Sequence, residues 1–323
     1  MSAQFIAPPA PRQSGGLCHL RWPALGTNCE VQFVCGDEVR RKAFETEAVG
    51  WVSSFEARYS RFKSDSALSR VNASAGREWV AIDAEMEQFL DLCASIFQMT
   101  SGVLDVTALP IMRLWDYKSQ SPRIPSNEEI ALALQLTGWN KVQRRPGFVR
   151  FAQSGMALDF GGWGKEYAVD MIAQIAVRHG LTQVLVDFGH DLCAVGAGLG
   201  KPAWHIGLED PDRPGIACWS SLAIKDRAVA SSGNYLRGFT LNGRRYGHIV
   251  DPRTGWPVSN DNKQVTVIAR GCLQAGVLAT AAFVLGPEKG IKLIEETIGA
   301  EGCIVANQAR YQTRGFYNYV VTR

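Results

Sequence analysis

The apolar residues of this 323-residue chain follow two different spacings, and the order of the resulting segments limits how it can fold. Residues 39–59 and 83–99 carry apolar or aromatic side chains at helical spacing, which predicts two helices packed on a sheet. Residues 28–34 alternate as a strand does, and residues 183–188 form a short apolar run typical of a buried strand. Strands and helices mix without strict alternation. This order predicts an α/β fold of the mixed α+β kind, with a mixed, largely antiparallel sheet layered with helices.

A capping box marks the start of another helix. Ser126 is followed three residues later by Glu129, so each side chain can bond to the backbone of the other, and the helix is expected to continue to residue 136. The same kind of pattern predicts further helices at residues 164–179, 275–285 and 287–297, and further strands at residues 204–208, 221–225 and 265–270, with two more after Cys303.

The composition is that of a globular protein, and its charges argue against one class of partner. With 46% hydrophobic residues the chain can bury a large core without disulfides, and residues 18–323 are expected to form a single domain. The net charge of +3 comes from basic and acidic residues spread along the whole length, so nucleic acid is not an expected partner. The cysteines form no C-x-x-C pair or cluster with histidine, so most are expected to be reduced and buried.

The first 17 residues differ from the rest. They are rich in Pro, Ser and Gly and are expected to form a flexible arm. They lack the charged start and the apolar centre of a secretory signal, and no stretch of the chain approaches the ~20 apolar residues of a membrane span. A cytoplasmic protein is the expectation.

Four segments combine glycine with polar residues, which usually has a local reason because glycine is costly inside a packed element. Each one taken singly can be explained as turn chemistry. They are TSGVLD (100–105), LDFGGWGKEYAVD (158–170), SSGNYLRG (231–238) and HIVDPRTGWPV (248–258).

Together and in this order, these segments resemble the ApbE-type flavin transferases, which are FAD:protein FMN transferases. The resemblance extends over residues 22–295 and includes LGTNCEV (25–31) and the segments 59–72, 105–117 and 265–286. It implies an α/β fold that binds FAD in a cleft, with Mg²⁺ bridging the diphosphate. It also implies a partner protein whose Ser or Thr hydroxyl accepts FMN.

The resemblance also implies the roles of individual residues. His248 would be the catalytic base, and the phosphate-side and adenosine-side contacts would be Lys165 and Asp159. The full set of implied FAD-binding positions is Leu25, Phe62, Val103, Leu104, Asp105, Asp159, Lys165, Ser232, Gly233, Val250, Asp251 and Thr254.

The implied metal site departs from the family pattern. Gly162 and Thr280 stand at metal-ligand positions, but Gly276 replaces the usual aspartate. Mg²⁺ usually takes one or two carboxylates together with substrate phosphates, and glycine offers no side-chain oxygen. Water or a carboxylate from elsewhere, such as Asp261, could fill the position. If the missing carboxylate limits the reaction, Gly276→Asp should raise turnover. His190 is a second departure, because the family more often has two glycines at residues 189–190.

The chemistry of the residues agrees with these roles. Cleavage of a diphosphate needs neutralised phosphate charge and an activated nucleophile. Lys165 can supply a positive charge, and the glycines at 161, 162 and 164 let backbone amides approach. His248 can accept the hydroxyl proton because an ordinary histidine titrates at about pH 6.5. Three functions remain open: FMN transfer, FAD binding without transfer, and hydrolysis of FAD to FMN and AMP.

Overall fold

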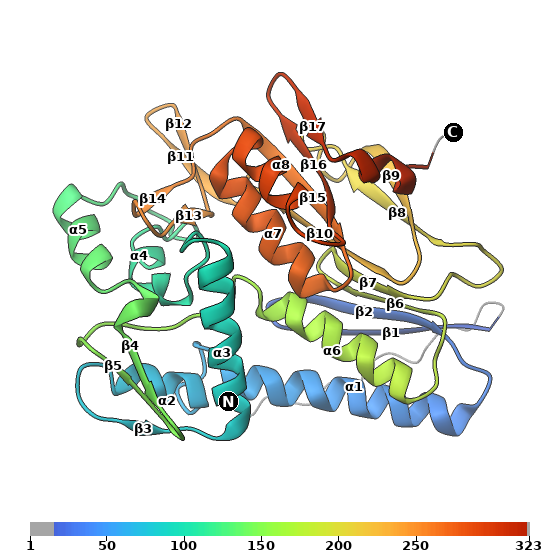
Figure 1. The fold of residues 1–323 in the computed structure, drawn as a ribbon, viewed down its shortest axis with the longest axis horizontal. Helices are drawn as coiled ribbons and strands as arrows, with labels where there is room; N and C mark the ends of the chain where they lie inside the picture. Colours follow the sequence, from blue (N-terminus) through green and yellow to red (C-terminus); the bar gives the residue numbers. More distant parts are fainter. Residues whose placement is uncertain (1–15, 322–323) are drawn as a thin grey trace.

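An antiparallel sheet of eight strands forms the centre of the computed structural model, which describes residues 16–321 (Figure 1). The strand order is β1-β2-β6-β7-β10-β15-β16-β17, and every neighbouring pair is antiparallel. The strands are β1 (Leu17–Ala24), β2 (Thr27–Val34), β6 (Val184–Phe188), β7 (Asp191–Val195), β10 (Arg227–Gly233), β15 (Asn262–Ala269), β16 (Glu301–Ala306) and β17 (Arg310–Gln312).

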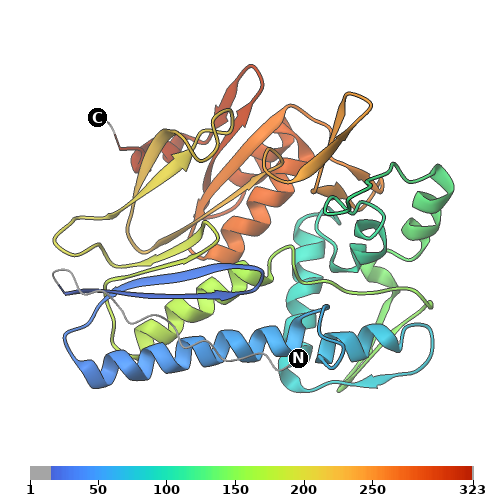
Figure 2. The ribbon, with the colours of Figure 1, turned by 180° about the vertical axis from the view of Figure 1, so that it is seen from behind.

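Helices cover one face of this sheet, and a hairpin covers the other (Figures 1 and 2). The helices are α1 (Glu38–Tyr59), α6 (Gly164–Arg178), α7 (Cys272–Leu285) and α8 (Pro287–Glu295). The hairpin of β8 (Trp204–Glu209) and β9 (Cys218–Ile224) packs on the opposite face with the 3₁₀ helix η3 (Arg314–Tyr319), around a cluster that includes Leu222 and Phe316.

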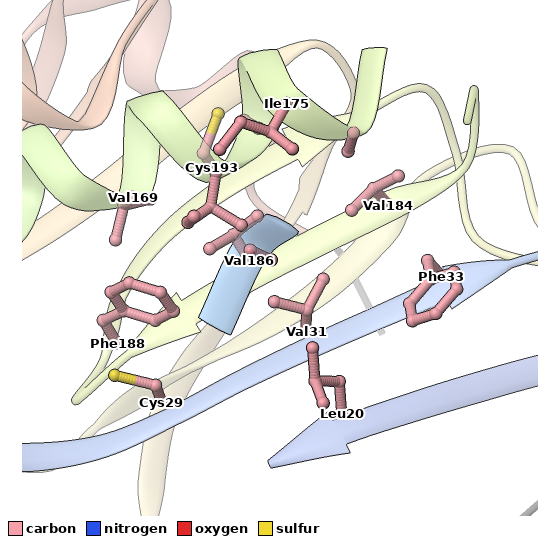
Figure 3. Close-up of a cluster of buried hydrophobic side chains, with 14 of the residues drawn as sticks. Leu20, Cys29, Val31, Phe33, Val169, Ile175, Val184, Val186, Phe188 and Cys193 are labelled. Atoms are coloured by element: carbon pink, nitrogen blue, oxygen red, sulfur yellow. The ribbon is translucent and has the colours of Figure 1, made fainter. Parts of the chain in front are cut away.

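The core between the sheet and α6 follows the apolar pattern of the strands. Val31 and Phe33 of β2 belong to one buried cluster with Val186 and Phe188 of β6 and Val169 of α6, and Figure 3 shows this cluster between the strands and the helix. All five side chains are buried, and each buried side chain of this size stabilises the fold by roughly 1.5–3 kcal/mol. This core fixes the start of α6 relative to the sheet.

A second group of elements packs beside the sheet around aromatic side chains. The rings of Phe55, Tyr59, Phe89, Phe160 and Trp163 contact one another in this cluster. The elements of this group are α2 (Ala67–Ala73), α3 (Ala84–Met99), α4 (Leu109–Met112), α5 (Asn127–Gln135), the 3₁₀ helices η1 (Val106–Ala108) and η2 (Trp139–Lys141), and the sheet of β3 (Val80–Ala81), β5 (Phe148–Phe151) and β4 (Val142–Arg145). Two small hairpins join β11 (Gly238–Leu241) to β12 (Arg244–Gly247) and β13 (Val250–Asp251) to β14 (Trp256–Pro257).

The structure confirms the predicted fold class and the predicted long elements. The capping box at Ser126 and Glu129 is present, and α1, α3, α6, α7 and α8 lie where the apolar spacing indicates. Strand β1 was not predicted, and it includes Leu17, which the sequence pattern assigned to the flexible arm. Residues 1–15 of that arm lie outside the described residues.

The cysteines agree with their sequence interpretation. All eight are free, and Cys18, Cys29, Cys93, Cys193, Cys272 and Cys303 are buried. Within residues 16–321, no helix combines the length and apolar character that crossing a membrane requires.

Candidate functional site

A small apolar cluster brings two of the glycine-rich segments together with helix α7. Val103 is buried against Ala281 of α7, and Ile249 and Val258 pack on the same cluster. Leu104 contacts this cluster and also the aromatic core. The segment around residue 103, the segment around His248 and the helix that carries Thr280 are therefore neighbours in space.

Asp159 connects the LDFGG segment to two other predicted positions. Its backbone N–H donates to the carbonyl of Val106 at 2.8 Å. Its carboxylate accepts from Arg61 Nε at 3.0 Å and from the Gly161 N–H at 3.0 Å. The neighbouring Phe62 is 81% exposed, with the Arg61 guanidinium 4.1 Å from the centre of its ring. An exposed phenyl ring beside a partly buried carboxylate is available to a ligand.

Leu25 lies in the tight turn between β1 and β2. Leu25 and Gly26 both have positive φ, 54° and 71°, as the favoured two-residue hairpin turn requires. The Leu25 N–H donates to Glu56 Oε1 of α1 at 2.9 Å, and its side chain packs against both large cores. The turn is thereby held against the end of α1 that leads to Phe62.

The carboxylate of Asp105 accepts hydrogen bonds from two backbone N–H groups and one hydroxyl. It accepts from the Thr107 N–H at 2.8 Å, the Thr107 hydroxyl at 2.6 Å and the Trp139 N–H at 3.1 Å. Burial raises the pKa of Asp105, while these hydrogen bonds oppose the rise. Asp105 therefore holds η1 and η2 in place beside the site. Its direct contact with FAD stays a prediction.

Lys165 stands in the first turn of α6 and forms an ion pair with Asp191 at the start of β7. Lys165 Nζ also lies 3.8 Å from Glu166 Oε1. The N-terminus of α6 has no side-chain cap, whereas the N-terminus of α7 is capped by Asp170, which accepts from the Cys272 and Leu273 N–H groups. The uncapped N–H groups of α6 beside a lysine make a favourable place for phosphate oxygens.

The predicted metal-ligand positions lie on α7, which packs against both β10 and α6, and just before α6. Thr280 Oγ1 is 2.8 Å from Ser232 Oγ, and Gly233 follows on the same strand. Gly162 precedes α6, and no atom lies within 4 Å of where a Cβ would stand. Within residues 16–321 no group of three His, Cys, Asp or Glu side chains is arranged to hold a metal. A cation here needs oxygen atoms from a ligand, as is usual for Mg²⁺.

The Glu166 side chain fills the space beside Gly276. A Cβ at residue 276 would lie 2.6 Å from Glu166 Cγ and 3.1 Å from Glu166 Oε1. Asp261, which the sequence suggested as a substitute, is exposed and accepts from Asn307 Nδ2 at 3.0 Å. The structure therefore does not favour higher turnover for Gly276→Asp, because the new side chain would collide with Glu166.

His248 stands between the two small hairpins with its imidazole largely shielded from water. Nδ1 is buried and makes no hydrogen bond within the described part of the chain, and the Tyr117 ring lies edge-on at 5.9 Å. Burial and, to a smaller extent, the positive charges of Arg237 and Arg245 together lower the pKa of His248 to about 4, against a backbone hydrogen bond at Arg237 that raises it. The ring is therefore neutral at neutral pH.

The residues that follow His248 form the turn that their composition suggests. Val250 pairs with Pro257, and the Asp251 carboxylate accepts from Arg253 Nε at 2.9 Å and Nη2 at 2.8 Å. The Thr254 N–H donates to the carbonyl of Asp251 at 3.2 Å. These contacts explain the turn without a ligand, so the predicted roles of Val250, Asp251 and Thr254 toward FAD stay predictions.

His190 completes the turn between β6 and β7. Gly189 and His190 have φ of 61° and 75°, a combination that explains why two glycines suit this position. The His190 side chain is exposed, and its N–H donates to Asp187 Oδ1 at 2.8 Å. The ring points to solvent.

A hollow of about 640 Å³ lies elsewhere, between α1, α2 and α3. Trp51, Arg58, Asp65, Arg70 and Glu85 are among the residues that line it, and none of the predicted site residues does. We therefore define the candidate site by the contacts above and not by this hollow.

Comparison with known proteins decides the family. The sequence profile of the ApbE family matches residues 25–304. The chain belongs to the ApbE family. It is 30% identical over 301 residues to the FAD:protein FMN transferase of Treponema pallidum, covering 87% of this chain and 82% of that protein. It is also 30% identical to a FAD:protein FMN transferase of Klebsiella pneumoniae, covering 84% and 79%.

Solved structures agree with this assignment. The ApbE protein of Thermotoga maritima superposes with a TM-score of 0.85 at 29% identity, covering 95% of this chain and all of that one. The flavin transferase ApbE of Vibrio cholerae gives a TM-score of 0.83 at 25% identity, covering 94% and 99%. The resemblance seen in the sequence is confirmed.

Within this ApbE fold, the structure adds three residues that the sequence analysis did not assign: Arg61, Asp191 and Glu166. Arg61 and Asp191 hold Asp159 and Lys165, and Glu166 fills the space beside Gly276. The sequence offered two hints that Glu166 and Asp191 belong to the site, because Glu166 directly follows Lys165 and Asp191 directly follows the unusual His190. Neither hint indicates which distant residue the carboxylate meets.

Proposed function

We propose that this chain is a Mg²⁺-dependent FAD:protein FMN transferase. The acceptor is a Ser or Thr hydroxyl of a partner protein. Its oxygen forms a bond to the phosphorus of the FMN half of FAD, the bond from that phosphorus to the bridging oxygen breaks, and AMP leaves with that oxygen. The relatives named for this activity and the family match over residues 25–304 support the proposal.

The single observation that carries it is the state of His248. Its half-buried imidazole, neutral at neutral pH, lies next to Ile249, which belongs to the apolar cluster of α7 and the residue 103 segment. The lowered pKa makes this imidazole a weaker base than the ordinary histidine assumed from the sequence. It is unprotonated at neutral pH and so can accept the hydroxyl proton as the oxygen attacks, which is general-base catalysis. The proton then resides on His248.

Lys165 and the N-terminus of α6 bind and orient the diphosphate. The ammonium supplies one positive charge, and Asp191 fixes its position. The first N–H groups of α6 lack a side-chain cap and point outward along the helix axis, so they can donate to phosphate oxygens. Mg²⁺, when bound, would neutralise charge on the phosphate oxygens. Thr280 and the backbone at Gly162 would hold it, together with the diphosphate.

The test measures AMP. The purified protein is incubated with FAD and Mg²⁺, with and without a candidate acceptor flavoprotein, and AMP is quantified by chromatography. A parallel sample contains EDTA. We expect AMP only when acceptor and Mg²⁺ are both present, together with covalent flavin on the acceptor. AMP without acceptor would instead identify a FAD hydrolase. Bound flavin without AMP in any sample would identify a FAD-binding protein that performs no transfer.

A further inference from the structure

Glu166 is a buried carboxylate that the site geometry leaves incompletely satisfied. It is 8% exposed, and Oε2 is buried with no hydrogen-bond partner among the described residues. A buried charge without partners is costly, so such groups are normally paired or bound to a metal. Glu166 therefore needs a positive partner beyond those that the chain provides.

The nearest positive group is shared. Lys165 Nζ is 3.8 Å from Glu166 Oε1, which is long for a direct ion pair, and its closer partner is Asp191. One ammonium therefore faces two largely buried carboxylates, whose side chains are 11% (Glu166) and 10% (Asp191) exposed. This arrangement leaves one negative charge uncompensated at the start of α6. A divalent cation would supply the missing charge.

The position of the carboxyl group points to the same conclusion. The carboxyl carbon of Glu166 lies 3.1 Å from the place that a Cβ of residue 276 would take. Thr280 follows Gly276 by one helical turn on the same face of α7, so the two positions are about 5–6 Å apart. The Thr280 hydroxyl has spare lone pairs while it bonds to Ser232. The Glu166 carboxylate and the Thr280 hydroxyl thus stand beside neighbouring turns on one face of α7.

We propose that Glu166 is the carboxylate ligand of a divalent-cation site that it forms with Thr280 and the diphosphate of FAD, and that Gly276 lacks a side chain to make room for it. The inference rests on the proposed function only for the identity of the diphosphate. It also explains how the chain can keep a metal site without an aspartate on α7. The described residues alone do not complete a metal site, so the cation and the diphosphate should bind together.

Binding of Mn²⁺ tests this proposal without measuring turnover. The concentration of free Mn²⁺ is followed by electron paramagnetic resonance in the presence of the protein, with and without FAD, and FAD binding is followed by flavin fluorescence with and without Mg²⁺. We expect the wild-type chain to bind Mn²⁺ tightly only with FAD. Glu166→Gln keeps the shape of the side chain and should weaken that binding by about tenfold or more, since even partners of metal ligands change affinity by this much.

A carboxylate exchange gives the sharpest result. Glu166→Gly combined with Gly276→Asp moves the carboxylate to α7 and should restore Mn²⁺ binding, whereas Glu166→Gly alone should not. The matched control is Asp261→Asn, an exposed carboxylate that is bound to Asn307 and should have no effect. Thermal melting of each variant verifies folding, and Glu166→Gln decides the matter even if the exchanged variant fails to fold.

The outcomes separate this proposal from the proposed function. Unchanged Mn²⁺ binding in a folded Glu166→Gln variant would overturn the metal role of Glu166, whether or not the wild-type chain transfers FMN. Loss of Mn²⁺ binding in that variant supports the role even if the wild-type chain forms no AMP, in which case only the proposed function fails.

Discussion

The hairpins around His248 and the contact between α6 and α7 differ in where the motif residues find their contacts. In the hairpins, the motif residues contact near neighbours in sequence, as when Asp251 accepts from Arg253. At the helix contact, the space beside Gly276 is filled by Glu166 from a different helix. The sequence of a local motif therefore predicts its own contacts. What replaces the missing side-chain oxygen at residue 276 is seen only when the two helices are packed together.

The largest expected effect lies in the hairpin region. His248→Asn removes the base and should lower the rate of FMN transfer by about 10²- to 10⁴-fold, with FAD binding retained. Single-turnover assays with acceptor measure the rate, and flavin fluorescence measures binding. His205→Asn is the matched control, because His205 is exposed on β8. Equal rates for the two variants would remove His248 from the chemistry.

The ion pair at the start of α6 combines a binding role with a stability role. Lys165→Met should weaken FAD binding by about tenfold or more and lower the free energy of unfolding by about 1–3 kcal/mol, because Asp191 loses its partner while buried. Adding Asp191→Asn should recover the stability but not the affinity, as chemical denaturation and FAD titration will show. If the double variant regains full affinity, Lys165 does not contact the diphosphate.

Alanine substitutions at two helical glycines compare a position crowded by Glu166 with one that has open space around it. Gly276→Ala should lower the free energy of unfolding by about 1–3 kcal/mol, because its Cβ would stand 2.6 Å from Glu166 Cγ. Gly50→Ala in α1 should raise it by about 0.5–1 kcal/mol, because nothing lies within 4 Å and alanine favours helices. Chemical denaturation measures both. A stabilising Gly276→Ala would mean that Glu166 does not occupy this space.

The mildest test concerns pH. Since burial lowers the pKa of His248 to about 4, its imidazole should remain neutral well below the ordinary value of about 6.5. Between these two values the unfolded chain binds the proton more readily, so His248 makes the fold less stable as the pH falls through this window. Nuclear magnetic resonance of labelled histidine, assigned with His248→Asn, measures the titration. A midpoint near 6.5 would place the ring in water.

The sequence predicts the long elements well and the short ones poorly. Helices α1 and α3 have enough turns for apolar spacing to be decisive, and the capping box fixes the start of α5. Strand β1 was missed although Leu20 and Trp22 alternate with exposed residues, because it directly follows a Gly-rich stretch and contains Pro23, which suits only an edge position. The small hairpins contain mostly turn residues, so no period develops.

In the candidate site, too, some features were predictable from the sequence and others were not. The motif segments predict which stretches converge, because their glycines and polar residues are informative within each segment. The partners Arg61 and Asp191 could not be assigned, since the pairing of Arg61 with Asp159 and of Asp191 with Lys165 depends on how elements pack. The role of Glu166 depends on the absence of a side chain at residue 276. The sequence shows that absence, but only the packing of α6 against α7 shows which side chain fills the space.

The distribution of cysteines has a practical consequence for observing FAD binding. Burial raises the pKa of the Cys29, Cys193 and Cys303 thiols to about 12, so these side chains hold almost no reactive thiolate at neutral pH. Cys218 is exposed on β9, on the face of the sheet opposite α6 and α7. A maleimide dye should therefore attach first at Cys218, and energy transfer from the flavin to that dye would report arrival and departure of the cofactor in the unaltered chain.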